Sequence, residues 1–373
     1  MTGAASIEVA ANDFRRQWAD VREDAVEAIN RVGESGHLIL GEEVAAFERE
    51  FAAWWGVPYA VGVASGLDAI EIGLRCAGVS AGDRVLTTPL TAFATTLAIL
   101  RAGAEPVWSD VEETGAIDLA RADAVLRADP SIRAVVPVHL YGHPIDPAGL
   151  ERLAAEHRVP IVEDCAQSAG AIRDGRPTGL AGVAAAVSLY PTKNLGALGD
   201  GGVLLTAESE VAERARRLRD YGQGERYEHL EIGLNSRLDE LQAAVLRSAL
   251  LPRLDGWIAR RREIGAHYER ELGPGLRPIG AGGGESARHL FPVEVAGDPS
   301  AVVASLRAQG IAVGRHYPFL CPDEPATEGT GVAADALDVA RRLCERELSL
   351  PIHPYLSDDE VEQVLDACAR AFS

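Results

Sequence analysis

The sequence predicts an α/β fold, in which a mostly parallel sheet is flanked by helices and a smaller α+β domain follows at the C-terminus. From Tyr59 to Glu163, short apolar runs alternate with segments of helical periodicity, a pattern typical of parallel strands joined by helices. Two further apolar runs then flank a glycine-rich turn, and beyond residue 252 the regular alternation stops. We therefore expect a large domain over residues 1–251 and a small domain over residues 252–373.

Two helices are expected before the alternation begins. Apolar residues recur at helical spacing over residues 20–34 and 42–55, and Gly33 and Gly56 close the two segments. The apolar faces consist of Val21, Ala25, Ile29 and Val32 in the first segment and of Val44, Phe47, Phe51 and Trp54 in the second. Both helices should pack on a core or on a partner chain.

The alternating region predicts five strands and four helices. The strands are expected over residues 59–63, 84–88, 106–111, 134–140 and 159–163, and the helices over residues 66–76, 93–101, 119–126 and 150–156. In such sheets, ligands bind beyond the carboxyl ends of the strands. Asp164 and the turn formed by Ser65 and Gly66 both follow predicted strands, so they are placed to contact a ligand.

The rest of the chain is less regular. Strands are expected over residues 183–187, 203–205, 290–295 and 311–313, and helices over residues 257–272, 301–309, 335–347 and 358–371. A further helix should begin at Asn235, because asparagine is a favourable N-cap. The glycine-rich segment 280–286 predicts a flexible loop.

The stretch SLYPTKNLGALGDGG, residues 188–202, places Lys193 in a glycine-rich turn between two apolar runs. Lysine is almost never fully buried unless it is paired. Burial lowers the pKa of a lysine, and a neutral amine can attack a carbonyl to form a Schiff base. A solvated lysine in a glycine loop explains this stretch equally well when it is taken alone.

A second stretch, VPIVEDCAQ at residues 159–167, is an apolar strand that ends in acids, and its Asp164 lies 29 residues before Lys193. Pyridoxal phosphate (PLP) requires such a pair. The lysine holds its aldehyde as an imine, and the aspartate keeps the pyridine nitrogen protonated so that the ring can accept electrons. Taken singly, Asp164 could equally be a helix N-cap.

Together these stretches, with VEDCAQSAGA at 162–171 and GLNSRLDELQAAVL at 233–246, closely resemble the DegT-type nucleotide-sugar aminotransferases. That family belongs to the fold-type-I, aspartate aminotransferase-like PLP enzymes, and the resemblance runs from about Gly36 to Pro354. It implies a PLP-transferase fold, a pyridoxamine phosphate intermediate and a homodimer with composite active sites. Lys193 and Asp164 are the catalytic residues that it implies.

The resemblance also implies roles in cofactor binding. The backbone amides of Gly66 and Leu67 would cradle the PLP phosphate, and a helix N-terminus is a favourable anion site in its own right. The other residues that it assigns are Phe93, which would stack on the ring, Gln167, near the ring hydroxyl, Ser188, on the phosphate, and Asn235, on the phosphate of the neighbouring subunit. From pattern alone, core packing explains Phe93 better and helix capping explains Asn235 better.

Substrate contacts are expected from Tyr190, His316 and Tyr317, because GRHYP at 314–318 resembles the family segment that faces the active site. A histidine beside a tyrosine and a proline is otherwise more often structural. Arg237 and Tyr221 lie in segments that relatives contribute near the site.

Composition excludes several classes of protein. The net charge is −20, which argues against nucleic-acid and anionic-membrane surfaces, although an anionic nucleotide-sugar needs only a few local cations. The five cysteines are scattered, and they predict neither a disulfide framework nor a metal site. The N-terminus does not resemble a signal peptide, and no apolar run approaches the roughly 20 residues of a membrane span. A cytoplasmic location is expected.

The expected reaction is transamination of a nucleotide-linked keto-6-deoxysugar, with L-glutamate as amine donor, in amino-deoxysugar and antibiotic biosynthesis. The GLDA turn at 66–69 and the HYP segment resemble members that aminate dTDP-3-keto-6-deoxyhexoses. A 4-keto sugar or an aminocyclitol precursor stays open as the substrate. A PLP-dependent sugar dehydratase would carry histidine in place of Lys193. A non-catalytic regulatory homologue would not need to retain Asp164, Gln167, Ser188 and Lys193 together.

Overall fold

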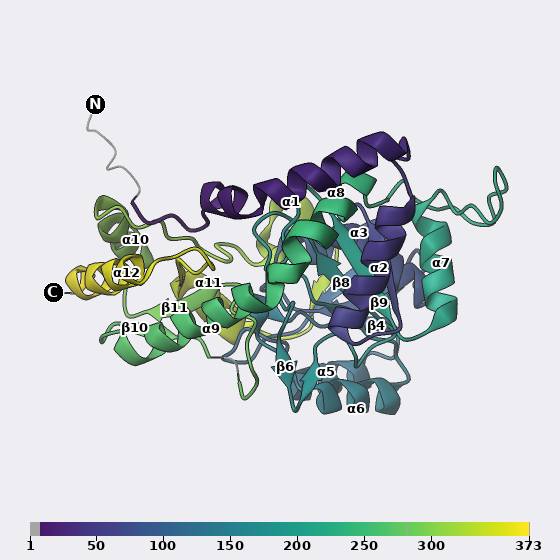
Figure 1. The fold of residues 1–373 in the computed structure, drawn as a ribbon. Helices are drawn as coiled ribbons and strands as arrows, with labels where there is room; N and C mark the ends of the chain where they lie inside the picture. The colour runs from purple at the N-terminus through teal and green to yellow at the C-terminus, as the bar shows by residue number, and fades with distance from the viewer. Residues whose placement is uncertain (1–7, 281, 373) are drawn as a thin grey trace.

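The computed structural model describes residues 8–280 and 282–372, and its centre is a twisted sheet with helices on both faces (Figure 1). One half of the sheet has the order β1 (Tyr59–Val63), β9 (Gly202–Thr206), β8 (Ala184–Ser188) and β5 (Val162–Asp164). The other half has the order β12 (Val332–Ala333), β3 (Glu105–Trp108), β2 (Arg84–Thr87) and β4 (Ile132–Val136). Parallel bridges from Val135 to Ile161 and from Val138 to Asp164 join the halves. The predicted, mostly parallel sheet is confirmed, and β9 is antiparallel to both of its neighbours.

Side chains of the strands alternate between two cores. On β8, Ala185 and Val187 face the core formed with the N-terminal helices, whereas Ala184 and Ala186 face the opposite core. The opposite core is closed by α3 (Gly66–Cys76), α4 (Phe93–Arg101) and α7 (Ser209–Arg219). The helices α5 (Leu119–Ala128) and α6 (Pro147–His157) pack on the other face of the sheet, against Leu86, Val135 and Ile161. Because β8 is rich in alanine, helix α3 can pack close to it.

The two predicted N-terminal helices are α1 (Phe14–Ser35) and α2 (Glu42–Trp55). The first is longer than predicted, because Asp13 caps it by accepting hydrogen bonds from two backbone amides, and Gly36, at φ +68°, ends it. Gly33 therefore does not end the helix. Ile29, which was expected in the core, is exposed, and Ala28 is buried there instead.

The helix expected at Asn235 begins later, as α8 (Glu240–Val245). The prediction that Asn235 is an N-cap is wrong, since the backbone around it is extended. Tyr221 N donates to Leu234 O at 2.8 Å, and Ser236 N donates to Arg219 O at 2.9 Å. A π-turn, Leu246–Leu250, and a short 3₁₀ turn, Leu251–Arg253, then lead into α9 (Leu254–Glu271).

A smaller antiparallel sheet lies towards the C-terminus, with the order β10 (Leu276–Pro278), β11 (Phe291–Val295) and β13 (Glu347–Leu350). It packs with α10 (Pro299–Ala308) and α12 (Asp358–Ala371), and α11 (Asp338–Arg346) precedes β13. One expectation here is wrong, and one strand was missed. Residues 311–313 form only an isolated bridge, from Val9 to Ile311, and β13 was not predicted because it follows α11 without a break. The loop at 280–286 includes residue 281, which lies outside the described residues.

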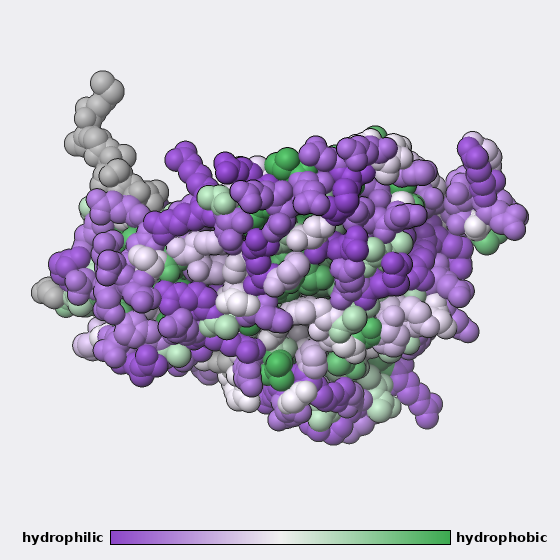
Figure 2. Space-filling view, viewed as in Figure 1, coloured by the Kyte–Doolittle hydropathy of each residue, from purple (hydrophilic) through white to green (hydrophobic). Residues whose placement is uncertain are grey.

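Short elements complete the fold: β6 (Ile172–Arg173), β7 (Arg176–Pro177) and the 3₁₀ turns Leu140–Gly142, Cys321–Asp323 and Pro325–Thr327. The face shown in Figure 2 is mostly hydrophilic. No helix in the described ranges is both long enough and apolar enough to cross a membrane. The domain boundary at residue 252 stays a prediction.

Candidate active site

A cavity of about 250 Å³ lies where the carboxyl ends of β1, β5 and β8 meet. Its lining includes most of the residues expected at the site: Gly66, Leu67, Asp164, Gln167, Ser188, Tyr190 and Lys193. These residues come from segments that are far apart in sequence. The sheet brings them together at the edge where ligands bind in α/β folds.

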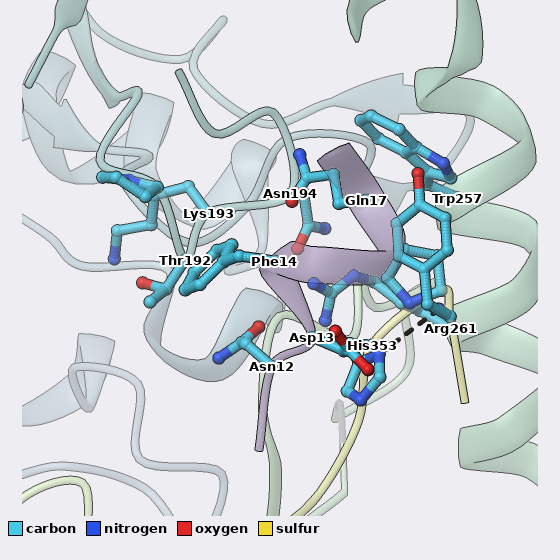
Figure 3. Close-up of a pocket in the computed structure, with 13 residues that line it drawn as sticks. Asn12, Asp13, Phe14, Gln17, Thr192, Lys193, Asn194, Trp257, Arg261 and His353 are labelled. Carbon is cyan, nitrogen blue, oxygen red and sulfur yellow. Dashed lines mark hydrogen bonds between the residues drawn. The ribbon is translucent and has the colours of Figure 1, made fainter. Parts of the chain in front are cut away.

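Lys193 lies in the turn after β8, where its backbone amide donates to Tyr190 O at 2.8 Å. It is the only lysine among the 373 residues. Desolvation lowers the pKa of Lys193 to about 8, and the negative charge of Asp164 opposes this shift. In Figure 3 the lysine amine points away from Trp257 and Arg261, which line a small neighbouring pocket. The neutral fraction of this amine at neutral pH is therefore far larger than that of an exposed lysine, although the ammonium still predominates.

Asp164 ends β5 and is only 4% exposed. Its Oδ1 accepts a hydrogen bond from Ala166 N at 3.0 Å, and its Oδ2 accepts one from Thr95 Oγ1 at 2.8 Å. Burial raises the pKa of Asp164, while these two bonds and Lys193 act in the opposite direction. A carboxylate offers about four lone-pair sites, so Asp164 can still accept a proton donor from a ligand.

An anion cradle forms at the start of α3. Ser65 caps this helix by accepting from Asp68 N at 3.1 Å, which leaves the amides of Gly66 and Leu67 in the unpaired first turn. A Cβ added to Gly66 would lie 2.7 Å from the Cβ of Ser188, and one added to Gly202 would lie 2.3 Å from the backbone of Ser65. Only glycine therefore fits at these two positions, and the backbone is left open to a ligand.

Gln167 links the cavity to the segment at 316–317. Its Oε1 accepts from Tyr141 N at 2.6 Å, and its Nε2 donates to Tyr317 OH at 3.0 Å. The hydroxyl of Tyr141 donates to His316 O at 2.8 Å. Burial, and then the charge of Lys193, lower the pKa of His316 to about 4, so its imidazole is neutral at neutral pH.

Other expected residues lie outside the lining of this cavity. Phe93 is half-buried at the first turn of α4, although its neighbours Ala92 and Ala94 line the cavity. Asn235 is exposed, and Arg237 places its guanidinium 5.2 Å from the centre of the Tyr221 ring. The roles expected for these side chains stay predictions.

Sequence reasoning missed two buried residues that contact the catalytic pair. Thr95 holds Asp164, as described above, and His289 Nε2 lies 3.5 Å from Lys193 Nζ. Thr95 could have been found, because Thr91 and Thr95 are polar residues four apart in an apolar helical segment, and their hydroxyls lie 3.1 Å apart. No local pattern distinguishes His289, which simply precedes a strand.

Beside Asp164, three buried side chains of metal-ligand type lie close together, namely His139, Glu163 and Cys165. Glu163 accepts from His139 Nε2 at 2.9 Å and from the backbone amides of Gly179, Ala181 and Gly182 at 2.7–3.0 Å. These bonds already use its carboxylate oxygens. The cluster therefore fixes the loop after β7 rather than offering a free ligand set.

Comparison with known proteins gives consistent matches over nearly the whole chain. The model of the DegT/DnrJ/EryC1/StrS aminotransferase family matches residues 19–369. A dTDP-3-amino-3,4,6-trideoxy-alpha-D-glucose transaminase of Streptomyces venezuelae is 41% identical over 361 residues, which cover 95% of this chain and 94% of the relative. A UDP-N-acetyl-3-dehydro-alpha-D-glucosamine 3-aminotransferase of Acidithiobacillus ferrooxidans is 37% identical, with 96% of each chain covered. The crystal structure of S. venezuelae DesV in complex with a ketimine intermediate superposes with a TM-score of 0.93 at 40% identity, covering 98% of this chain and 99% of that one.

Proposed function

Because the chain belongs to the DegT/DnrJ/EryC1/StrS aminotransferase family and has the fold of DesV, we propose that it aminates a keto-6-deoxysugar carried on a nucleotide. The substrate that we favour is a dTDP-3-keto-6-deoxyhexose, with L-glutamate as the amine donor. The pairing of Lys193 with Asp164 in one cavity supports the transamination chemistry. Two relatives whose names specify position 3 of the sugar support the choice of a 3-keto group.

The family is PLP-dependent, and the residues of this cavity fit PLP. The amides of Gly66 and Leu67, with Ser188 beside them, offer donors for its phosphate. Asp164 offers a buried acceptor for its pyridine nitrogen, and Lys193 offers an amine for its aldehyde. When bound, PLP would supply the electrophilic carbon and the electron sink that transamination needs.

Lys193 would act as the base of the reaction. Its pKa of about 8 lies near neutral pH, where an amine can both accept and return a proton. Its Nζ would take the proton from Cα of the amine donor. Burial of the site excludes water that would compete for this proton.

Asp164 would hold a positive charge on the nitrogen of the bound ring. Thr95 and Ala166 donate hydrogen bonds to its carboxylate, and bonds of this kind favour the ionised form. An ion pair of this type is strong in a dry site. Gln167, which Tyr141 and Tyr317 hold in place, would contact the ring hydroxyl.

We also propose that the active unit is a homodimer in which Asn235 acts on the neighbouring subunit's cofactor. Lys193 is the only cation among the described residues that line the cavity, yet a nucleotide-sugar and a cofactor phosphate bring several negative charges. Asn235 is exposed and belongs to the segment between α7 and α8, part of which projects from the body in Figure 1. A second chain could therefore supply the missing polar contacts.

The proposed reaction can be tested directly by incubating the PLP-loaded protein with L-glutamate and one acceptor at a time. The acceptors are a dTDP-3-keto-6-deoxyhexose, its 4-keto isomer, a UDP-linked 3-keto-N-acetylhexosamine and a keto-inositol. Mass spectrometry measures the amino product, and coupled assay measures 2-oxoglutarate. The proposal expects the first acceptor to give the highest kcat/KM. Preferential turnover of the 4-keto sugar or the keto-inositol would replace it with the corresponding alternative.

A further inference from the structure

We propose that His289 is a positioning residue for Lys193: its Nε2 atom accepts a hydrogen bond from the lysine amine and directs that amine at the cavity. The two nitrogens lie 3.5 Å apart, at the outer limit of hydrogen-bond distance. His289 is only 6% exposed. The inference rests on the proposed role of Lys193 as the reacting amine, but not on the choice of sugar.

The surroundings of His289 force its imidazole to be neutral. Burial, and then the positive charges of Lys193 and Arg261, hold the pKa of His289 well below its usual range. Arg261, on α9, is itself buried, and it donates to the carbonyl oxygens of His289 at 3.3 Å and of Ile352 at 2.7 Å. Two cations therefore lie near this ring, and a second proton on it would be repelled by both.

Only one tautomer of a neutral imidazole can accept a hydrogen bond from the ammonium at Nε2. Lys193 can only donate while it is charged, so Nε2 of His289 must carry the lone pair and Nδ1 must carry the proton. Nδ1 is buried and has no hydrogen-bond partner among the described residues. Within the described part of the chain, the only hydrogen-bond contact of the imidazole nitrogens is therefore with Lys193, and no other polar group there competes to orient the ring.

Three titratable groups interact with Lys193: Asp164, His289 and His316. The first ends β5, the second lies just before β11, and the third lies before the 3₁₀ turn at Cys321–Asp323. Asp164 attracts the ammonium, and His316 is neutral. Among the described residues, His289 is the one neutral side-chain acceptor within hydrogen-bond distance of Nζ. Removing that acceptor should leave the charged amine less well solvated, and its pKa should fall.

The test uses the apoprotein, so it does not depend on substrate. Because Lys193 is the only lysine, protein grown with ¹⁵N-labelled lysine gives a single side-chain amine signal, whose pH titration reports the pKa of Lys193. In His289→Leu, which removes the acceptor, we expect that pKa to be about one pH unit lower than in the unmodified protein. In His289→Gln, which restores an acceptor, we expect most of this shift to be reversed.

His143→Gln serves as the matched control. His143 is equally buried, but its ring nitrogens contact Ser286 and Ile279 O rather than Lys193, so the pKa of Lys193 should not change. In the PLP-loaded enzymes, the pKa read from the pH–rate profile should follow the same order, lowest in His289→Leu and unchanged in His143→Gln. An unchanged pKa of Lys193 in folded His289→Leu would overturn the proposal.

A second measurement needs no variant of His289. In ¹⁵N-histidine spectra of the unmodified protein, His289 should be in the Nδ1–H tautomer, and its Nε2 signal should move in Lys193→Met. An Nε2–H tautomer in the unmodified protein would contradict the inference even if His289→Leu fails to fold. Neither measurement involves a sugar, so a different substrate would leave both expectations intact.

Discussion

At the scale of single residues, the chemistry depends on one amine and one carboxylate that share a partly dry cavity. Lys193 carries a lowered pKa because it is desolvated, whereas Asp164 keeps two hydrogen-bond donors of its own. Burial pushes both groups towards their neutral forms, and their mutual attraction opposes it. The contacts of each side chain with its neighbours therefore decide how reactive the pair is.

The hydroxyl of Thr95 should support catalysis through Asp164. Thr95→Val keeps the volume of the side chain but removes a donor to the carboxylate, so the pKa of Asp164 should rise and the ion pair with the ring should weaken. We expect kcat to fall about 10-fold, against a fall on the order of 10³-fold for Asp164→Asn. Steady-state kinetics of the loaded enzyme measure both.

Thr96→Val is the matched control for that change. Thr96 is equally buried, but its hydroxyl accepts from Trp108 Nε1 at 3.3 Å and has no contact with Asp164. Its kcat should stay close to that of the unmodified enzyme. Equal losses in the two variants would mean that the effect comes from packing and not from the bond to Asp164.

The lowered pKa of Lys193 also predicts how the stability of the apoprotein depends on pH. The unfolded lysine binds its proton up to about pH 10.4, whereas the folded one releases it near pH 8. Between these values the unfolded state holds more protons, so stability rises with pH in this window. Below pH 8, the buried ammonium lowers stability by a constant amount.

Lys193→Met removes this cost. At pH 7 we expect the apoprotein variant to be more stable by about 3 kcal/mol, and the gain should shrink towards zero as the pH approaches 10. Urea unfolding at several pH values measures the difference. A gain that does not change with pH would show that the lysine is not desolvated in the folded apoprotein.

At the scale of elements, the sequence predicted those strands and helices whose apolar residues follow a regular pattern from end to end. The bounds of β1, α3 and α4 agree with the sequence prediction, because each begins at a turn and carries an unbroken apolar period. The start of α8 could not be predicted, since long-range backbone bonds to residues 219–221 keep Asn235 extended. Strand β13 could not be predicted either, because it follows a helix directly and only its pairing with the distant strand β11 distinguishes it from the end of that helix.

The start of α2 shows the same dependence on distant residues. Gly41, at the N-cap, has no side chain, and the carboxylate of Glu240 accepts instead from the amides of Gly41, Glu43 and Val44 at 2.7–3.0 Å. Glu240 itself lies at the first turn of α8 and is buried. One side chain thus ties two helices of the core together.

Glu240→Ala should therefore destabilise the protein by about 2–3 kcal/mol, because it leaves one buried and two partly buried amides without their charged acceptor. Denaturant unfolding of the apoprotein measures the loss. Glu42→Ala is the control, since Glu42 is exposed in the same first turn of α2, and it should cost well under 1 kcal/mol. Similar losses in both would mean that the helix dipole and not the three bonds is responsible.

At the scale of the whole molecule, the described chain leaves apolar surface uncovered and its site short of cations. Large apolar side chains stay exposed on α1, on α8, in the link between α1 and α2 and in the loop between β8 and β9: Phe14, Trp18, Val26, Ile29, Leu38, Ile39, Tyr190, Leu198 and Leu241. The sequence predicted that the N-terminal helices pack on a core or on a partner chain. In the structure, α1 buries one face in the core of its own chain and leaves apolar side chains of another face exposed. Whether a partner chain covers the exposed face could not be predicted from one chain, because it depends on what a second chain brings.

Mixed dimers test whether the site is shared. We expect Lys193→Ala chains to be inactive and Asn235→Ala chains to be weakened, and each is purified, dissociated and reassociated with the other. If Asn235 acts on the neighbouring subunit, a mixed dimer has one site with both lesions and one site with neither. Random reassociation should then restore about a quarter of the unmodified activity, since half of the dimers are mixed and each has one intact site.

The opposite arrangement gives a distinct result. If Asn235 served its own chain, every site in a mixed dimer would carry one lesion, and mixing would restore nothing. The exposed position of Asn235, outside the lining of its own cavity, favours the shared site. Reassociation of Lys193→Ala with Lys193→Met is the control, because no arrangement of those chains contains an intact site. A fully active monomer at the assay concentration would contradict the shared site altogether, since a single chain would then hold every group that the reaction needs.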